Sequence, residues 1–293
     1  MKNIQMNRST FAVLILTHGR ADNVITVRTL RNAGYSGRIV FVIDNEDDQA
    51  EKYIQNYGHE NVIMFDKKKY ADECDECNNF DERRTITMAR NAGFDIAKQL
   101  GLSYFVEMDD DYTAFDFRIP IEKKGTCGIV KPLKCLDKVF SLYIKYYDEA
   151  KLSSVAFSQG GDFIGGVIKN GKSFRFSKRK CMNTFFLSTS RRFKFVGAMN
   201  EDVNTYTTLG SRGSVFITAP FISITQKGTQ SQAGGITEMY KRYGTYCKAF
   251  TTVMNMPSSV KVAMMGDGKS RLHHSIKWKY TVPKILDEAN KKV

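Results

Sequence analysis

Short apolar runs alternate with amphipathic segments through the first third of the chain. Each run is rich in β-branched or aromatic residues, so we predict buried strands at residues 11–17, 38–43, 61–65 and 103–108. Apolar residues recur at helical spacing between the runs, which predicts helices at residues 24–31, 51–57 and 83–100. This alternation favours an α/β fold with a doubly wound, mostly parallel central sheet flanked by helices. Ligands of such sheets bind beyond the carboxyl ends of the strands.

The pattern changes in the rest of the chain. Residues 66–82 are polar and are expected to form a long loop, whereas further helices are predicted at residues 131–150, 201–209 and 235–250. Shorter strands and glycine-rich turns are expected beyond residue 152. A chain of 293 residues can bury one large core, and no linker or internal repeat divides it. We therefore expect one domain over residues 1–293.

Three consecutive aspartates, Asp109, Asp110 and Asp111, follow the strand predicted at residues 103–108. Alternate residues of an extended segment point the same way, so Asp109 and Asp111 can share a divalent cation while Asp110 faces elsewhere. Such a cation can neutralise the departing diphosphate in glycosyl transfer from a nucleoside diphosphate. The alternative is an acidic surface turn, and the position at the end of a buried strand weighs against it.

Positive charge is concentrated in one part of the chain. From Gly165 to the end there are 22 basic and 6 acidic residues, a net charge of +16, whereas residues 1–164 hold 22 basic and 25 acidic residues, a net charge of −3. Such asymmetry is typical of a protein that meets a polyanion with one face, because each lysine or arginine that neutralises a phosphate releases a counterion. A solvated basic surface that only aids solubility is the alternative.

The sequence contains no membrane segment. The apolar run at residues 11–16 is far too short to cross a bilayer, and no cleavable leader precedes it. The six cysteines lack the spacing of a disulfide framework, so reduced thiols are expected. We expect a cytoplasmic protein that does not attach to a membrane.

Several motifs resemble a known family. The order strand, THGR (17–20), helix, strand, Asp44, helix, followed by ARNAGFDIA (89–97) and FVEMDDDY (105–112), resembles the nucleotide-sugar half of GT-A glycosyltransferases. Three later motifs resemble phage-type TET-associated DNA glycosyltransferases, which are related to the base J glucosyltransferase. They are RKCMNTFFLS (179–188), GAMNEDVNTYTTLGSRGSVFIT (197–218) and ITQKGTQSQAGGITEMYKRYGTYCKAF (224–250).

The resemblance implies a GT-A-like domain with two halves. Residues of about 1–125 would bind the nucleotide sugar, and the basic half at about 126–293, with a smaller strand-rich subregion, would face the acceptor. It also implies a transferase that uses Mn²⁺ or Mg²⁺ and moves a sugar from a nucleotide sugar, UDP-linked by preference. The acceptor would be the hydroxyl of hydroxymethylcytosine or hydroxymethyluracil in phage DNA, in the host cytoplasm.

Carried over residue by residue, the resemblance assigns roles at the donor. Thr17 and Arg20 would lie beside the base and phosphate, Asp44 at the polar edge of the base, Arg90 at the ribose or diphosphate, and Asp110 at the ribose. The polar, glycine-rich segment at residues 227–235 can approach a sugar or phosphate closely, and it could order only when the donor binds. Its candidate donor-binding residues are Gln230, Ser231, Gln232, Gly234 and Gly235.

Two further roles concern catalysis and the metal. Asp202, which follows Glu201 at the start of a predicted helix, matches the position of the general base that removes the acceptor proton. Capping of the helix is its alternative role, and the two are compatible. His273 is a candidate third metal ligand beside Asp109 and Asp111, although no motif fixes its position.

Three other functions stay open at this point. A saccharide or cell-surface glycan could be the acceptor, but the basic half and its interleaved aromatics (Phe174, Phe176, Tyr240, Tyr243, Tyr246 and Trp278) fit nucleic acid better. A non-catalytic DNA-binding relative would have lost the carboxylate pair, which is present. A nucleotidyltransferase would carry a glycine-rich phosphate loop after the first strand, where THGRADN has a single glycine. The stereochemical outcome, the donor sugar and the oligomeric state are not determined by the sequence.

Overall fold

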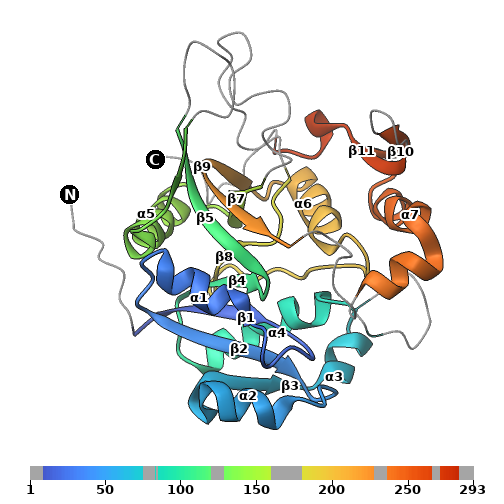
Figure 1. Cartoon of the computed structure of the whole chain (residues 1–293). Coiled ribbons are helices and arrows are strands. Elements are labelled where there is room, and N and C mark those ends of the chain that lie inside the picture. The colour runs from blue at the N-terminus through green and yellow to red at the C-terminus, as the bar shows by residue number, and fades with distance from the viewer. Residues whose placement is uncertain are drawn as a thin grey trace.

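A mixed sheet of nine strands forms the centre of the molecule (Figure 1). The computed structural model describes residues 9–74, 83, 85–119, 129–159, 180–227, 236–265 and 271–283. The strand order is β3-β2-β1-β4-β8-β7-β9-β5-β6. The strands are β1 (Phe11–Leu16), β2 (Arg38–Asp44), β3 (Val62–Phe65), β4 (Tyr104–Asp109), β5 (Tyr112–Ile119), β6 (Ile129–Pro132), β7 (Ser154–Ser158), β8 (Phe185–Ser188) and β9 (Phe216–Gln226).

The four strands expected from the sequence form the parallel part of this sheet. β1 pairs in parallel with β2 and β4, and β2 pairs in parallel with β3. Every residue of β1 is buried, which is why its sequence is a continuous apolar run rather than an alternating one. The predicted α/β sheet is therefore confirmed, and the carboxyl ends of its parallel strands lie at one edge.

The remaining strands make the sheet mixed. β8 pairs antiparallel with β4 and β7, β9 pairs in parallel with β7, and β5 pairs antiparallel with both β9 and β6. β5 begins at Tyr112, directly after the three aspartates, and was not predicted. The chain thus turns at the aspartates and runs back across the sheet, which holds this acidic segment between two strands.

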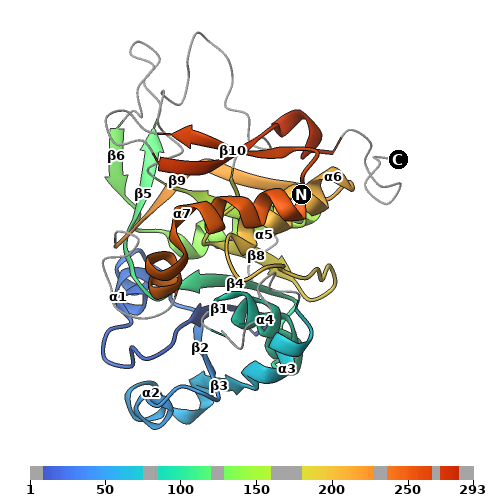
Figure 2. The same ribbon diagram turned by 90° about the vertical axis from the view of Figure 1, so that its right-hand side faces the viewer.

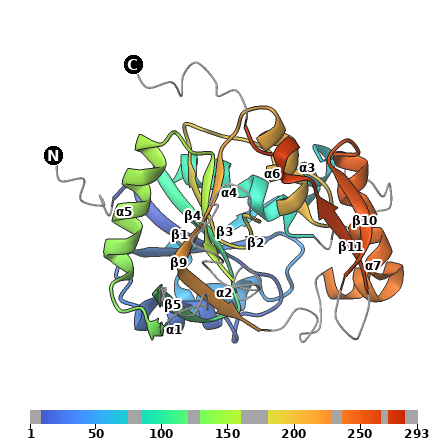
Figure 3. The same ribbon diagram turned by 90° about the horizontal axis from the view of Figure 1, so that it is seen from above.

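Helices cover both faces of the sheet, as seen from above in Figure 3. One core cluster includes side chains of α1 (Ile25–Asn32), α2 (Ala50–Tyr57) and α5 (Leu136–Glu149). The other includes side chains of α3 (Lys67–Asp72), α4 (Thr87–Gln99) and α6 (Glu201–Ser211). Each strand of the parallel part contributes to both clusters, so the sheet has an apolar core on either side.

A C-terminal layer stands outside α6 (Figure 2). It consists of α7 (Ile236–Asn255) and the antiparallel pair β10 (Val260–Met265) and β11 (Arg271–Ile276). Helix α7 is kinked at Gly244, whose φ of 74° is not helical. Short 3₁₀ turns at His59–Asn61 and Trp278–Tyr280 accompany these elements.

Three predicted boundaries were wrong. The helix expected over 131–150 begins at Leu136, because the β-branched residues Ile129 and Val130 pair with β5 and Pro132 follows them. The helix expected over 83–100 begins at Thr87. The segment 66–82, expected as a loop, contains α3, whose N-terminus is capped by the Asp66 side chain accepting from the Lys69 backbone N–H. The boundary expected near residue 125 lies outside the described residues.

Candidate active site

The ends of β1 and β4 meet at one edge of the sheet, because Leu16 is in register with Asp109. There the Asp110 side chain, 3% exposed, accepts hydrogen bonds from Thr17 Oγ1 at 2.7 Å and from Arg20 Nη1 at 2.7 Å. Tyr53 of α2 completes the group: its hydroxyl lies 2.8 Å from Thr17 Oγ1 and accepts from the Arg20 backbone N–H at 2.8 Å. The structure thus brings together three of the residues expected at the nucleotide.

Asp44 ends β2 at the same edge and is also buried. Its carboxylate lies 2.7 Å from His18 Nδ1 and 3.3 Å from Lys67 Nζ. Burial alone would raise the pKa of Asp44, but the hydrogen bond from His18 and the charge of Lys67 outweigh it, so the pKa lies below its usual value. The same bond raises the pKa of His18. Asp44 is therefore an ionised carboxylate that already has two basic neighbours.

Asp109 and Asp110 point to different partners, as the alternation of an extended segment requires. Asp109 Oδ1 lies 3.4 Å from Arg90 Nη2, whereas Asp110 binds Thr17 and Arg20. Burial raises the pKa of Asp109 to about 7, even though Arg90 opposes the shift. Burial and the charge of Asp110 raise the pKa of Asp111. At both aspartates, the nearby arginines do not fully offset the effects of burial and of the neighbouring carboxylates.

Asp109 and Asp111 fit a divalent cation by their chemistry. Carboxylate oxygens are the ligands that Mg²⁺ and Mn²⁺ prefer. Asp111 Oδ1 is buried and has no hydrogen-bond partner, so an oxygen donor is left over at this position. Among the described residues no three His, Cys, Asp or Glu side chains are grouped as a metal site.

His273 is placed elsewhere in the described structure. It lies on β11, where its Nδ1 is 2.9 Å from the backbone oxygen of His274. Since no group of three potential ligands occurs in the ranges that the structure covers, His273 is not gathered with Asp109 and Asp111. The histidine belongs to a hairpin that packs on α7, and its assignment as a third ligand stays a prediction.

Arg90 of α4 lies at the centre of a buried ion cluster and is 2% exposed. Its Nε donates to Glu201 Oε1 at 3.1 Å, and its Nη2 lies 3.4 Å from Asp109 Oδ1. Its Nη1 lies 3.8 Å from Glu107 Oε2. The expected contact of Arg90 with ribose or diphosphate is thus not the one this structure provides, because three carboxylates surround the guanidinium. Arg90 instead joins the carboxyl end of β4 to the start of α6.

Glu107 is the least exposed member of this cluster, with 0% exposure in the middle of β4. Burial raises the pKa of Glu107 well above its usual value, and Arg90 opposes that shift. Helix α4 leaves room for the Glu107 carboxylate because it has a glycine, Gly93, at this position. An added Cβ there would lie 2.1 Å from Glu107 Oε1. The glycine of the ARNAGFDIA motif therefore admits a carboxylate between helix and sheet.

Glu201 and Asp202 occupy the first turn of α6, where the helix dipole favours negative charge. The residue at the N-cap is Asn200, in the left-handed region with φ 55°, so Asp202 is not the cap. The Asp202 carboxylate accepts from the backbone N–H of Val203 at 2.7 Å. Burial, and next the charge of Glu201, raise the pKa of Asp202 to about 6. Asp202 is therefore mostly ionised at neutral pH but easily protonated, as a general base must be.

Some expected site residues lie outside the described residues. These are Gln230, Ser231, Gln232, Gly234 and Gly235, together with Phe174 and Phe176. Of the other aromatics, Trp278 stacks on Tyr206 at a ring distance of 5.8 Å, which is a packing contact against α6.

Four residues of the site were not predicted: His18, Tyr53, Lys67 and Glu107. Glu107 left a signal, because it is the single charged residue in the apolar run 103–108 and a buried carboxylate requires a partner. Tyr53 and Lys67 left none, because their roles depend on contacts with β1 and β2 that are distant in sequence.

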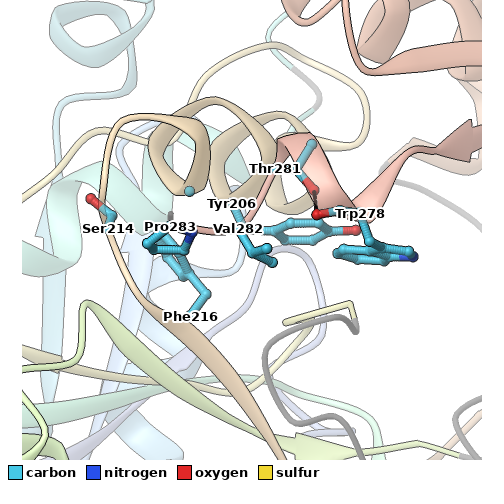
Figure 4. Close-up of a pocket in the computed structure, with 8 residues that line it drawn as sticks. Tyr206, Ser214, Phe216, Trp278, Thr281, Val282 and Pro283 are labelled. Carbon is cyan, nitrogen blue, oxygen red and sulfur yellow. Dashed lines mark hydrogen bonds between the residues drawn. The ribbon is translucent and has the colours of Figure 1, made fainter. Parts of the chain in front are cut away.

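A small pocket lies at the other end of α6 (Figure 4). Tyr206, Phe216, Trp278 and Pro283 are among its lining residues. Gly210 there allows close packing, since an added Cβ would lie 2.2 Å from the Thr281 backbone oxygen. The pocket lies toward the carboxyl end of the helix, away from Glu201 and Asp202, and is not part of the candidate site.

Comparison with known proteins finds a match to a protein family. The model of a family described as TET-Associated Glycosyltransferase matches residues 11–235. No curated protein is significantly similar to the chain in sequence. Among the described residues, no helix combines the length and apolar character needed to span a bilayer.

Solved structures share the fold. A mannosyltransferase from Pyrobaculum calidifontis, PcManGT, solved with GDP-Man and Mn²⁺, is 14% identical with a TM-score of 0.51, over 91% of this chain and 67% of that chain. Glucosyl-3-phosphoglycerate synthase from Mycobacterium tuberculosis, solved with Mg²⁺ and UDP, is 9% identical with a TM-score of 0.44, over 92% of this chain and 88% of that chain. At 14% identity the likeness to PcManGT concerns the fold, which is that of GT-A glycosyltransferases.

Proposed function

The chain belongs to the TET-associated glycosyltransferase family, and from this premise we propose that it moves a sugar from a nucleotide sugar to a hydroxymethylated pyrimidine in DNA. The donor in this proposal is UDP-linked, and the divalent cation is Mn²⁺ or Mg²⁺ held by Asp109 and Asp111. Thr17, Arg20, Asp44 and Asp110 form the donor end of the site. The reaction belongs in the cytoplasm of a phage-infected host, where DNA and nucleotide sugars are both present.

One observation carries the proposal: the Arg90 guanidinium contacts both Asp109, at the end of β4, and Glu201, at the start of α6. A single buried side chain therefore connects the candidate metal carboxylate to the helix that bears Asp202. Metal-assisted glycosyl transfer needs a cation at the diphosphate and a base at the acceptor hydroxyl within one site. These residues supply both from adjacent elements.

The chemistry follows from the positions of these groups. A bound divalent cation would stabilise the negative charge that develops on the diphosphate as it leaves. Asp202, with a pKa of about 6, accepts the proton of the hydroxymethyl group while that oxygen bonds to the anomeric carbon. The bond from the anomeric carbon to the diphosphate oxygen breaks in the same step, so the transfer inverts configuration. Arg90 fixes the positions of Glu201 and Asp109 through its ion pairs with both.

The acceptor assignment rests on the family and on charge. The net charge of +16 from Gly165 onward suits a polyanion, and a pyrimidine inside a duplex would have to be flipped out to reach Asp202. PcManGT, the similar structure with bound GDP-Man and Mn²⁺, supports a nucleotide-sugar donor with a metal. A saccharide acceptor is the competing assignment.

The direct test is incubation with hydroxymethylcytosine and hydroxymethyluracil DNA, a panel of UDP and GDP sugars, and Mn²⁺ or Mg²⁺. Nucleoside mass spectrometry should show a hexose or pentose adduct on one of the two bases, absent without metal. The Asp109→Asn and Asp111→Asn variants are the controls for the metal. Sugar transfer to an oligosaccharide with none to DNA, or full activity in EDTA, would contradict the proposal.

A further inference from the structure

The outward side of α7 carries large apolar residues that the described structure leaves exposed. Tyr246, Phe250 and Met254 are spaced by four residues, and they are 50%, 40% and 51% exposed. Residues at this spacing lie on one side of a helix. We call these three residues the α7 stripe. Met264 of β10, 62% exposed, lies on the strand that packs beside α7.

The two aromatic rings of the α7 stripe are already arranged as a platform. The rings of Tyr246 and Phe250 are stacked, with centroids 5.6 Å apart and planes 9° apart. Exposed apolar residues scattered singly are ordinary on a protein surface, but a contiguous group marks an interaction site. Flat aromatic faces of this kind contact nucleic-acid bases and sugars without sequence preference.

The opposite side of the same helix is fixed to the candidate active site. Asn200, the N-cap of α6, donates through Nδ2 to the backbone oxygen of Lys248 at 2.6 Å and to Thr252 Oγ1 at 3.2 Å. Positions 248 and 252 face α6, and the α7 stripe lies two residues away from each, which is the far side of the helix. One helix therefore separates the stripe from the turn that bears Asp202. Figures 1 and 2 show α7 on the outer side of α6.

The net charge of the C-terminal layer favours DNA over a second copy of this chain as the occupant of the stripe. Residues 236–283 contain 8 basic and 2 acidic residues, and Lys261, Lys277 and Lys279 are exposed. In a symmetric dimer through the stripe, each lysine would face the same surface of the partner copy, so like charges would meet. A polyanion meets this charge favourably. The segment also begins where the family match ends, at residue 235, so the family model does not account for it.

We propose that the α7 stripe is a docking surface for the acceptor DNA, an inference that rests on the proposed function for its substrate. Tyr246 and Phe250 contact bases or sugars several nucleotides away from the target, because α7 lies between them and Asp202. The lysines of β10 and of the segment after β11 contact phosphates. Docking here holds the strand next to α6, where Asp202 meets the flipped base.

Binding to DNA tests the surface independently of catalysis. The probe is a fluorescein-labelled duplex with one hydroxymethylcytosine, titrated by anisotropy at several KCl concentrations without donor. The Tyr246→Ala/Phe250→Ala variant should bind about tenfold to a hundredfold more weakly, since each aromatic stack contributes about one order of magnitude. Its salt slope should match that of the parent protein, because no charge is removed.

The matched control is Tyr146→Ala on α5, which also removes an exposed aromatic, 46% exposed, from a helix on the opposite side of the molecule (Figure 3). It should bind the duplex as the parent does. A Lys261→Gln/Lys277→Gln variant should lower the slope of log K against log salt, by about 0.9 for each phosphate that the protein no longer neutralises. UDP binding with Mn²⁺, measured by calorimetry, should be the same in all variants, which reports an intact donor site.

The outcomes separate this inference from the proposed function. Parent-like affinity of the aromatic variant, a parent-like slope of the lysine variant, or no DNA binding by the parent at low salt would each overturn the docking surface. So would a parent that sediments as a dimer and an aromatic variant that sediments as a monomer. If the parent binds the duplex through the stripe but transfers no sugar to it, the proposed function fails while the docking surface stands.

Discussion

Asp202 lies at the first turn of α6 with a pKa raised to about 6, which sets the pH dependence that we expect at the scale of a single residue. A general base acts in its deprotonated form, so kcat should fall as pH drops through 6, about tenfold per pH unit below it. Asp202→Asn should lower kcat by about 100-fold to 10,000-fold and leave donor affinity unchanged. Measurement of kcat from pH 5 to 8 checks both. An unchanged rate and profile in the variant would exclude the base role.

The same ionisation predicts that this variant is more stable than the parent at neutral pH. The pKa of Asp202 is raised in the folded state above its usual 3.8, so the folded protein favours the protonated form. That favourable contribution is complete below the unfolded pKa and is lost as pH rises through about 6. Asp202→Asn should therefore have the higher Tm at pH 8, with a smaller difference at pH 4. A lower Tm of the variant at pH 8 would mean that favourable interactions of the ionised Asp202 carboxylate outweigh the cost of burying it.

Asp111 offers a prediction about the metal that does not depend on turnover. Its Oδ1 is buried without a hydrogen-bond partner, so a cation bound with UDP would satisfy it. Mn²⁺ with UDP should stabilise the parent by about 2.7 kcal/mol when the ligand is at 100 times its Kd. The Asp111→Asn variant should lose most of this increase in Tm, whereas UDP alone should act alike on both proteins. An equal Mn²⁺ effect on the two would remove Asp111 from the metal site.

Gly93 tests the packing of Glu107. The Cβ of an alanine would lie 2.1 Å from Glu107 Oε1, so Gly93→Ala should destabilise the fold by about 1–3 kcal/mol although alanine favours helices. Removing the obstructing side chain should reduce that cost. In a double-mutant cycle with Glu107→Ala, urea unfolding should therefore show that the double variant loses less free energy of unfolding than the two single variants lose together. Strict additivity would show that the two residues do not conflict.

At the scale of elements, Arg90 is the connection between α4, β4 and α6. Arg90→Met would leave the buried carboxylates of Glu107 and Asp109 without a cation, which typically costs about 3–5 kcal/mol. Because the pKa of each is raised, both protonate as pH falls, so the loss should be larger at pH 8 than at pH 5. Urea unfolding of parent and variant at the two pH values measures the difference.

The matched control for Arg90 is a second arginine–carboxylate pair that involves α4, Arg192 with Asp95, whose side chains are 41% and 39% exposed. Arg192→Met should cost at most about 1 kcal/mol, because water already solvates both charges. An equal loss in the two variants, or a loss for Arg90→Met that does not depend on pH, would contradict the role of the buried cluster.

Element boundaries followed partners rather than local patterns. Residues 129–132 form β6 because β5 is available to pair with them, and β5 in turn pairs with β9, more than a hundred residues away in sequence. The spacing of apolar residues within a segment does not indicate which distant strand it pairs with. The parallel strands were recognisable because burial on both faces imposes a continuous apolar run on each of them.

At the scale of the whole molecule, the uneven charge predicts two different salt dependences. KM for acceptor DNA should rise steeply between about 50 and 200 mM salt, by orders of magnitude if six or more phosphates are contacted. KM for the nucleotide sugar should change far less, because the donor end is built from buried groups such as Asp44 and Asp110 that salt screens weakly. Steady-state kinetics with each substrate varied in turn checks this. If the KM values for DNA and for the nucleotide sugar changed equally with salt, the basic residues from Gly165 onward would not be contacting many DNA phosphates.

The sequence by itself determined the α/β class, the four parallel strands and the edge of the sheet where Thr17, Asp44 and the aspartates collect. It did so because a strand buried on both faces must be apolar and because parallel strands end at a common edge. It also carried the family, through motifs spread over most of the chain.

Only the tertiary structure decided what those side chains face. Arg90 and Glu201 are 111 residues apart, and their pairing arises because α4 and α6 cover the same face of the sheet. The same packing placed His273 on a hairpin against α7 and raised the pKa of Asp202 to about 6. Burial and long-range contacts set charge and position, and these are properties of the assembled fold rather than of any local run of residues.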